Sequence, residues 1–372
     1  MKVLYIGYYK EKSDWGIQTV NQILALERAG VDVACRSIEL TAKETPAALK
    51  HLERKDIGDC THCIQHVFPE HMVGTGKFVK NVGFLTNNFV KMNHSSWVEK
   101  LSMMDEVWVP SQSCWRENLP ESIKEIATVI PLALDIDSFN RRYGNMNIPE
   151  AQGKFKVYSF ASPHETNGLT WLLAAFHSEF DVVEDATLIL CVKADSPDGR
   201  QEVELVENLS RKVKENLRLH RSGDEYTKDI ILAANLTESQ QCELHQHCDS
   251  YVTTNTEFTF PLSEIHAAGF GNNPIVAGSS SVTEYVGKDN GVPSICQVMQ
   301  SKSSMFPDQM NGHDYFLRPD EYHLKLKLRE AYNKWKKNPM EYKLDSKKAA
   351  LEQLSEFSMN TIGNKMKEAL SV

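Results

Sequence analysis

The sequence predicts an α/β protein built from two similar halves, each a parallel sheet covered by helices. Short apolar strands alternate with helix-like segments along most of the chain, which is the pattern of parallel sheets with helices on both faces. A polar stretch rich in Gly and Pro, from Asn140 to Lys154, interrupts the alternation once, and a second run begins at Phe155. A chain of 372 residues has room for two domains of ordinary size.

Composition and charge indicate a globular protein without a general basic surface for nucleic acid. The chain is 41% hydrophobic and 24% charged, with a net charge of −9. No apolar run approaches the roughly 18 residues needed to span a bilayer, so no transmembrane segment is predicted. The first residues, Met1 to Tyr9, are too short and too aromatic for a signal peptide. Scattered cysteines are typical of reduced thiols, and we therefore expect a cytoplasmic protein.

The first half opens with a β-loop-α-β unit of Rossmann type. Lys2 to Tyr8 is a continuous apolar strand, and after a polar loop and Gly16 the apolar residues recur with helical spacing from Ile17 to Glu27. Gly30 ends this helix, and Val31 to Ser37 follows as a second strand. The loop lacks the G-x-G-x-x-G fingerprint of dinucleotide sites, so a nicotinamide enzyme is not predicted.

Polar residues follow several later strands of this half. His66, Thr86 with Asn87, and Ser111 each stand where a predicted strand ends, and in a parallel sheet those ends form the ligand crevice. His66 is equally compatible with a packing residue whose hydrogen bonds are satisfied inside the core. The strands are predicted at residues 63–68, 81–85, 106–110 and 126–131, with helices at 97–104 and 111–118.

The second half repeats the alternation and ends in helices. Residues 250–277 are predicted to form a strand, a polar loop, a short helix and a second strand, in which Glu257 and Glu264 flank the helix start. A carboxylate there can bind sugar or ribose hydroxyls, or it can be an ordinary helix cap. Strands are predicted at 155–161, 187–192 and 229–232, and helices at 169–176, 203–215, 238–247, 323–336 and 346–370, the last interrupted near Phe357.

Two groups of Cys and His have a partial likeness to metal sites. One contains Cys60, His62, Cys63 and His66, and the other contains Cys242, His245, His247 and Cys248. Neither group has a second pair at the spacing that zinc sites use, and both fall in predicted strand or helix. We therefore predict no metal site.

Several segments, taken in order, resemble those of the retaining family-4 glycosyltransferases of GT-B fold, and the resemblance covers nearly the whole chain. The matching segments are 129–139 (the family's "IPNGVD…F"), Leu172 to Phe176 ("LLxAF"), 250–277 (the donor loop "E-G-F-G" leading into "P-x-x-E-A"), Glu284 to Val286, Tyr315 to Asp320, and Phe357 with Ser358 ("FSW").

The resemblance implies two Rossmann-like domains that face a central cleft. It implies transfer of a sugar from a nucleoside-diphosphate sugar with retention of configuration, and no tightly bound cofactor or metal. The expected domains are an acceptor-side domain at 1–145, a nucleotide-sugar domain at 146–345 and a C-terminal helix at 346–372 that packs back on the first domain. The acceptor is a glycan, a small molecule or, on a further reading, modified DNA.

Residue by residue, the resemblance assigns most of the site to the second domain. Glu264 matches the glutamate that holds the ribose hydroxyls, and Glu257 is the candidate for the first glutamate of the family's paired motif. In the first domain Gly16 matches a glycine loop near the donor phosphate, and Asn87 (or Thr86) falls near the position of a sugar-contacting histidine. Glu257 and Asn87 are therefore the catalytic candidates. The remaining candidates are Thr259, Phe260 and Pro261, whose loop meets the sugar and diphosphate, and His66 and Thr86 on the acceptor side.

The chain departs from the family pattern in two places. The two glutamates are separated by one residue fewer than in the family motif, so Thr256 competes for the first position. The Arg and Lys that normally contact the diphosphate are replaced by Ser162 and Asn167, which removes two positive charges from the leaving group. His164 and Lys193 are the nearest substitutes in the sequence.

The sequence therefore predicts a glycosyltransferase, with two alternatives left open. The missing Arg and Lys are compatible with a catalytically lapsed relative that only binds nucleotide or glycan. A DNA-base glycosyltransferase of phage type needs a basic groove, to which Arg141, Arg142, Lys336 and Lys337 contribute little.

Overall fold

The computed structural model describes most of the chain. The described residues are 1–38, 44–86, 95–144, 146–161, 168–193, 199–217, 219, 225–233, 235–253, 262–278, 281–292, 294–298 and 315–371.

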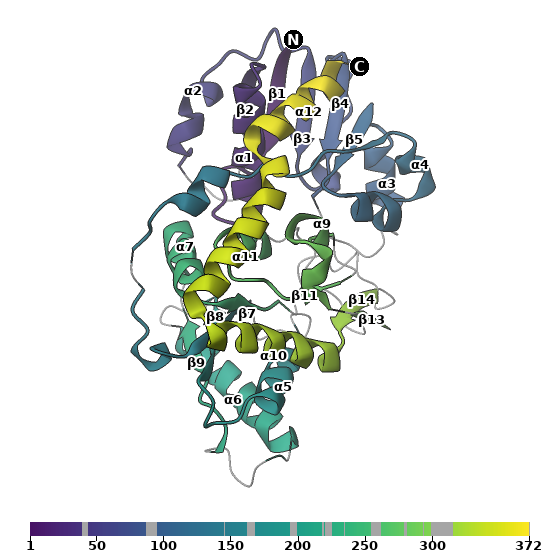
Figure 1. The fold of residues 1–372 in the computed structure, drawn as a ribbon. Helices are drawn as coiled ribbons and strands as arrows, with labels where there is room; N and C mark the ends of the chain where they lie inside the picture. The colour runs from purple at the N-terminus through teal and green to yellow at the C-terminus, as the bar shows by residue number, and fades with distance from the viewer. Residues whose placement is uncertain are drawn as a thin grey trace.

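The first half is a six-stranded, fully parallel sheet with helices around it (Figure 1). The strand order is β2-β1-β3-β4-β5-β6, and the inner strands are almost wholly buried, as expected where helices cover both faces. The strands are β1 (Lys2–Gly7), β2 (Asp32–Ser37), β3 (His62–His66), β4 (Lys80–Phe84), β5 (Glu106–Val109) and β6 (Ala127–Val129). The helices are α1 (Asp14–Arg28), α2 (Lys50–Glu53), α3 (Ser95–Leu101) and α4 (Glu121–Lys124), with a π-helical segment at Cys114–Asn118.

The second half has a parallel sheet of order β10-β7-β8-β9 and a smaller antiparallel pair. Its main strands are β7 (Phe155–Ala161), β8 (Ala186–Val192), β9 (Ile230–Ala233) and β10 (Ser250–Tyr251); shorter pairs are formed by β11 (Val276–Ala277) with β12 (Gly291–Val292) and by β13 (Ser294–Val298) with β14 (Tyr315–Pro319). The helices are α5 (Leu169–Glu179), α6 (Arg200–Leu217), α7 (Glu238–His247), α8 (Ser263–Gly269), α9 (Thr283–Val286) and α10 (Glu321–Lys337).

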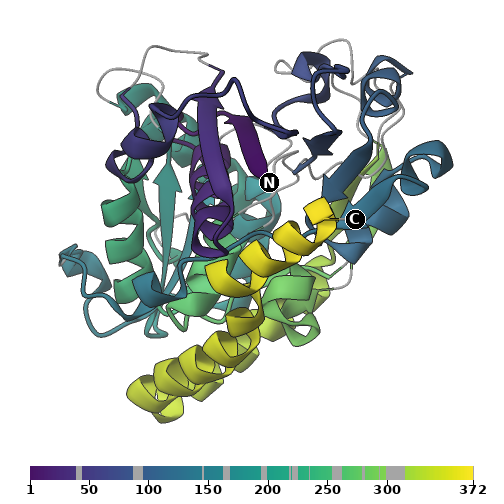
Figure 2. The same ribbon diagram turned by 90° about the horizontal axis from the view of Figure 1, so that it is seen from above.

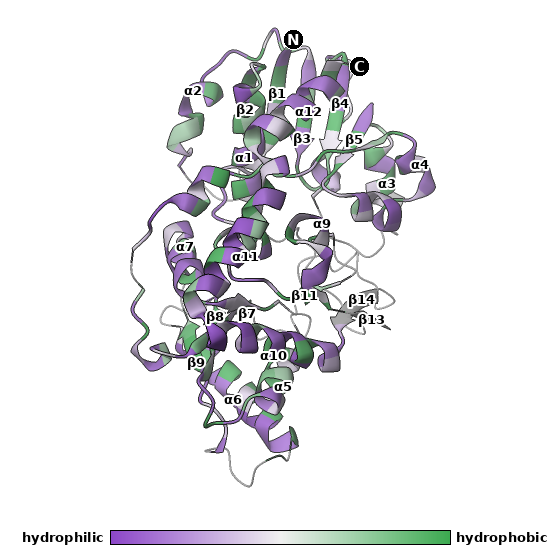
Figure 3. Ribbon diagram, viewed as in Figure 1, coloured by the Kyte–Doolittle hydropathy of each residue, from purple (hydrophilic) through white to green (hydrophobic). Residues whose placement is uncertain are grey.

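The last two helices return from the second half to the first. α11 (Pro339–Leu354) begins where Asn338 caps it by accepting a hydrogen bond from the Glu341 N–H, and α12 (Met359–Ser371) follows after a short 3-10 turn. The exposed front of α10 and α11 is mostly hydrophilic (Figure 3). Seen from above, α12 lies beside α1 (Figure 2). The close approach needs Gly363, because a Cβ there would lie 2.0 Å from the Ala25 carbonyl oxygen.

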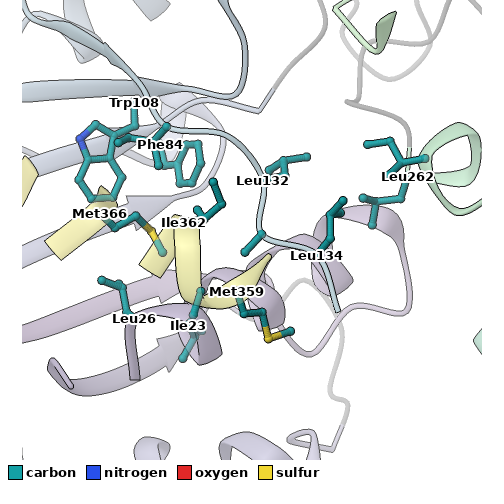
Figure 4. Packing of buried hydrophobic residues seen from close by; sticks show 14 of the residues in the cluster. Ile23, Leu26, Phe84, Trp108, Leu132, Leu134, Leu262, Met359, Ile362 and Met366 are labelled. Carbon is teal, nitrogen blue, oxygen red and sulfur yellow. The ribbon is translucent and has the colours of Figure 1, made fainter. Parts of the chain in front are cut away.

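One apolar core joins the two halves. Ile362 and Met366 of α12 lie among Ile23 and Leu26 of α1 and Phe84 and Trp108 of the sheet (Figure 4). The same core continues through the strand-like segment after β6 to α8 and α9, through Leu132, Leu134, Leu262, Ile265 and Tyr285. Burying each of these side chains stabilises the folded state by roughly 1.5–3 kcal/mol. The core therefore holds the two halves in their relative position, together with the chain that connects them.

Candidate functional site

The carboxyl ends of β1, β3 and β4 meet at one edge of the first sheet. His66 is the last residue of β3, and Thr86 follows β4 by two residues. Their side chains approach each other, with 3.0 Å between His66 Nε2 and Thr86 Oγ1. Both residues are buried, at 4% and 1% exposure. The two residues predicted on the acceptor side are thus neighbours at the edge where parallel sheets bind ligands.

A small hollow lies against this pair, and its walls include aromatic side chains. Trp15 stacks on Tyr8 with their ring centroids 5.5 Å apart, and it also contacts Phe68 at 3.8 Å. The side chains leave no room for a water molecule in the hollow as it stands. The full lining is Tyr8, Trp15, Thr19, His66, Val67 and Thr86.

His66 is held as a neutral imidazole. Burial lowers its pKa to about 3, so the ring carries no charge at neutral pH. Phe84 stacks on the ring at 4.7 Å, and Tyr5 meets it edge-on at 6.2 Å. Tyr5, whose own pKa burial raises, places its hydroxyl 3.0 Å from His66 Nδ1. His66 therefore serves as a hydrogen-bonding group, because a general base needs a pKa near the working pH.

The loop before α1 leaves room only for glycine at position 16. It lies in the first turn of α1, which Ser13 caps by accepting a hydrogen bond from the Gly16 N–H at 3.4 Å. A Cβ at this position would lie 1.8 Å from the Glu11 carbonyl oxygen, so only glycine permits the loop to fold over the helix start. The glycine that the resemblance assigned to the donor phosphate thus has a sufficient structural reason of its own.

Glu264 lies in the first turn of α8 and is 2% exposed. The segment before it is tied to the first half, because the Leu262 N–H donates to Asp14 Oδ2 at 3.0 Å. Burial raises the pKa of Tyr251 well above its usual value, and the charges of Glu264 and Asp14 raise it further. The carboxylates of Glu264 and Asp14 are therefore both near enough to act electrostatically on the Tyr251 hydroxyl.

Of the other predicted site residues, the structure describes only Lys193. Lys193 directly follows β8 and its side chain is exposed. The remaining candidates lie outside the described residues, and their roles stay predictions: Asn87, Ser162, His164, Asn167, Thr256, Glu257, Thr259, Phe260 and Pro261.

Sequence reasoning missed a contact between the halves at α9. Glu284 accepts hydrogen bonds from the backbone N–H groups of Gln112 and Ser113, at 2.9 and 2.7 Å, and from the Ser113 hydroxyl at 2.6 Å. The next residue, Tyr285, donates to the Pro110 carbonyl at 2.7 Å and accepts from the Leu132 N–H at 2.9 Å. The only signal in the sequence was that Glu284 begins one of the segments that resemble the family.

The cysteine and histidine groups form no metal centre in the part of the chain that the structure describes. Burial raises the pKa of Cys63 and of Cys248 to about 12 each, which disfavours the thiolate that a metal would need. No helix among the described residues is both long enough and apolar enough to cross a bilayer.

Comparison with known proteins establishes the fold. No protein-family model matches the chain, and no curated protein sequence matches it. Among solved structures, HepE of Anabaena in complex with UDP has a TM-score of 0.60 at 13% identity, with 100% of both chains covered. A trehalose-6-phosphate protein of E. coli bound with UDP-2-fluoro glucose has a TM-score of 0.63 at 10% identity, covering 100% of this chain and 99% of the other. Sucrose-phosphate synthase of Thermosynechococcus elongatus has a TM-score of 0.61 at 14% identity, covering 100% and 98%. The chain thus has the two-domain GT-B fold, as the resemblance implied.

Proposed function

We propose that this protein is a glycosyltransferase that moves a sugar from a nucleoside-diphosphate sugar to a separate acceptor, with retention of configuration. The observation that carries the proposal is the buried Glu264 carboxylate at the start of α8, beside the start of α1 and within a GT-B fold. A carboxylate accepts strong hydrogen bonds, and the two hydroxyls of a ribose can both donate to one carboxylate. The solved structures that bind UDP or a UDP-sugar support the same donor class.

In this proposal each half contributes one side of the site. Glu264 binds the ribose, and the loop that contains Thr259, Phe260 and Pro261 contacts the sugar and diphosphate. Thr86 and His66 line the acceptor side. Retention needs no strong enzymic base, which suits a His66 ring that burial keeps neutral. Stabilisation of the departing diphosphate then supplies most of the rate enhancement, through backbone N–H groups and through His164 or Lys193 in place of the missing Arg and Lys.

The test is a thermal-shift screen against UDP-, GDP- and ADP-sugars, followed by titration of the best nucleotide into Glu264→Gln. A ligand that binds only the folded state raises the melting temperature. The substitution should weaken nucleotide binding at least roughly tenfold, because one carboxylate oxygen no longer accepts a hydrogen bond. Glu202→Gln is the matched control, since Glu202 is also a buried helical glutamate, at 7% exposure, but lies on α6. Unchanged nucleotide affinity in a folded Glu264→Gln protein would contradict the proposal.

A second candidate is a lapsed relative that binds nucleotide without turning it over. The replacement of the family's Arg and Lys by Ser162 and Asn167 favours it. The two candidates differ in turnover: release of free nucleoside diphosphate from any bound nucleotide sugar rules out the lapsed relative, and binding without any release rules out the enzyme.

A further inference from the structure

A chain of three hydrogen-bonding groups runs from the core of the first half to the hollow. Tyr5 lies inside β1 at 0% exposure, and its hydroxyl is 3.0 Å from His66 Nδ1. On the other side of the ring, His66 Nε2 is 3.0 Å from the Thr86 hydroxyl, at the sheet edge. Thr19 Oγ1 lies 3.5 Å from Nδ1, but it donates its own hydrogen to the Trp15 carbonyl at 2.7 Å.

This series of hydrogen bonds has one hydrogen more than its two links need. A neutral His66 has one ring hydrogen, and Tyr5 and Thr86 contribute one hydroxyl hydrogen each. The two links of the chain use only two of these three hydrogens. The third is therefore left at one end, either on Tyr5 or on Thr86.

The hollow distinguishes the two ends: Tyr5 and Thr86 are both buried, at 0% and 1% exposure, but only Thr86 lines the hollow, where a ligand oxygen can accept its hydrogen. Within the described residues, the hydroxyl of Tyr5 has hydrogen-bond contact only with His66. Leaving its hydrogen unpaired in the core costs roughly 1–3 kcal/mol. Donation from Tyr5 to Nδ1 avoids that cost and places the ring hydrogen on Nε2, which donates to Thr86 Oγ1. The Thr86 hydroxyl then accepts from His66 and has its own hydrogen free for another oxygen.

We propose that Thr86 donates this hydrogen to a hydroxyl oxygen of the sugar-bearing ligand, and that Tyr5 and His66 are positioning residues that fix its direction. The inference rests on the proposed function and specifies the chemistry of one part of the site. A sugar suits the hollow because aromatic side chains, Trp15 and Tyr8 among them, line it beside the Thr86 hydroxyl, which binds an oxygen. Binding requires the lining side chains to move apart, because they leave no room even for a water molecule.

The first experiment measures the His66 tautomer directly. Nitrogen-15 NMR of the imidazole in the full-length protein should show Nε2 protonated and Nδ1 unprotonated. In Tyr5→Phe, Nδ1 loses its donor, and we expect the ring hydrogen to move to Nδ1 and face Thr19. Tyr9→Phe is the control, because Tyr9 is also buried and its hydroxyl donates to Glu53 at 2.6 Å, away from His66. A wild-type ring with the hydrogen on Nδ1 overturns the inference.

The second experiment locates the ligand oxygen and uses UDP, UDP-glucose and glucose 6-phosphate as probes. Thr86→Val should lower the affinity for one of the two sugar compounds roughly tenfold and leave UDP binding unchanged, whereas Thr86→Ser retains the donor and should bind like the wild type. A loss for UDP-glucose identifies the donor sugar as the partner of Thr86, and a loss for glucose 6-phosphate with UDP present identifies an acceptor sugar. Tyr5→Phe should produce the same loss, with no further loss in the double variant.

The outcomes separate this inference from the proposed function. If Thr86→Val binds every probe like the wild type, or loses affinity for UDP as much as for the sugars, the inference is wrong while the proposed glycosyltransferase stands. If the wild type binds neither sugar probe, the inference is also overturned. Failure of every nucleotide in the thermal-shift screen counts instead against the proposed function, and the tautomer measurement still decides whether the hydrogen chain is oriented as described.

Discussion

Replacing Glu284 with glutamine should loosen the contact between the two halves. Glu284 belongs to α9 in the second half, but its carboxylate caps the helical segment that follows β5 in the first half. The N–H groups of Gln112 and Ser113 lie in the first turn of that segment, where backbone donors have no partner within the helix. A negative charge there also interacts favourably with the positive end of the helix dipole.

The size of the effect follows from the hydrogen bonds. Three donors meet the carboxylate at 2.6 to 2.9 Å, and hydrogen bonds to a charged acceptor contribute roughly 1.5–3 kcal/mol each. In Glu284→Gln one oxygen remains for the two bonds from Ser113, but the amide NH₂ then faces the Gln112 N–H, donor against donor. Glu284 is half-buried, which weakens the electrostatic part, so we expect a loss of about 2–3 kcal/mol in the free energy of unfolding.

Urea denaturation and amide hydrogen exchange together measure this loss. The free energy of unfolding should fall by the stated amount, and exchange at Gln112 and Ser113 should accelerate more than exchange in the sheets. Glu121→Gln is the control, because Glu121 pairs with Lys124 on the surface, with a side chain 88% exposed, and such pairs contribute at most about 1 kcal/mol. Equal stability of the two variants, with unchanged exchange at the two amides, would refute the reasoning.

Two further predictions concern packing and acid sensitivity. Gly363→Ala should lower the free energy of unfolding, measured by urea titration, by at least about 2 kcal/mol, because the added Cβ would lie 2.0 Å from the Ala25 carbonyl oxygen. Gly76→Ala is the control and should cost little, because no atom lies within 4 Å of a Cβ at that position. Burial lowers the pKa of His66 to about 3 and that of His266 to about 4, while both are near 6.5 when unfolded, so the unfolded chain binds more protons below pH 6.5. Stability should therefore fall by about 1.4 kcal/mol per pH unit and per histidine from pH 6.5 down to about pH 4, and urea titrations of the wild type and His66→Gln should show a shallower slope in the variant.

The sequence predicted the sheets well because their signal is local. Each parallel strand is buried on both faces, so it appears as a short apolar run between polar loops, and the predicted strand at 155–161 has the bounds of β7. Parallel pairing also explains why His66 and Thr86 were expected near each other: neighbouring strands end at the same edge. The limits of the domains, as predicted from the resemblance, stay a prediction.

The hydrogen-bond partners of the site residues could not be predicted from the sequence, because they depend on the register in which the strands pair. Tyr5 was predicted only as one residue of an apolar strand, and its burial agrees. Its contact with His66 arises because β1 pairs with β3 so that Tyr5 lies opposite Ile64, two residues before His66. A shift by one residue would turn the Tyr5 side chain to the other face of the sheet and remove the contact. No pattern within either segment encodes that pairing.

The contacts between the halves also bear on how the proposed site is held together. Residues 262–286 belong in sequence to the second half, yet they are bonded to the first half near both ends, through Leu262 to Asp14 and through Glu284 to Ser113. Glu264 lies between these two contacts, and its neighbour Ile265 belongs to the core that also contains side chains of the first half. Its distance from the Thr86 edge is therefore set by local hydrogen bonds and packing more than by the connecting chain. Loosening the Glu284 contact should then weaken nucleotide binding at Glu264 under conditions in which the protein is still folded.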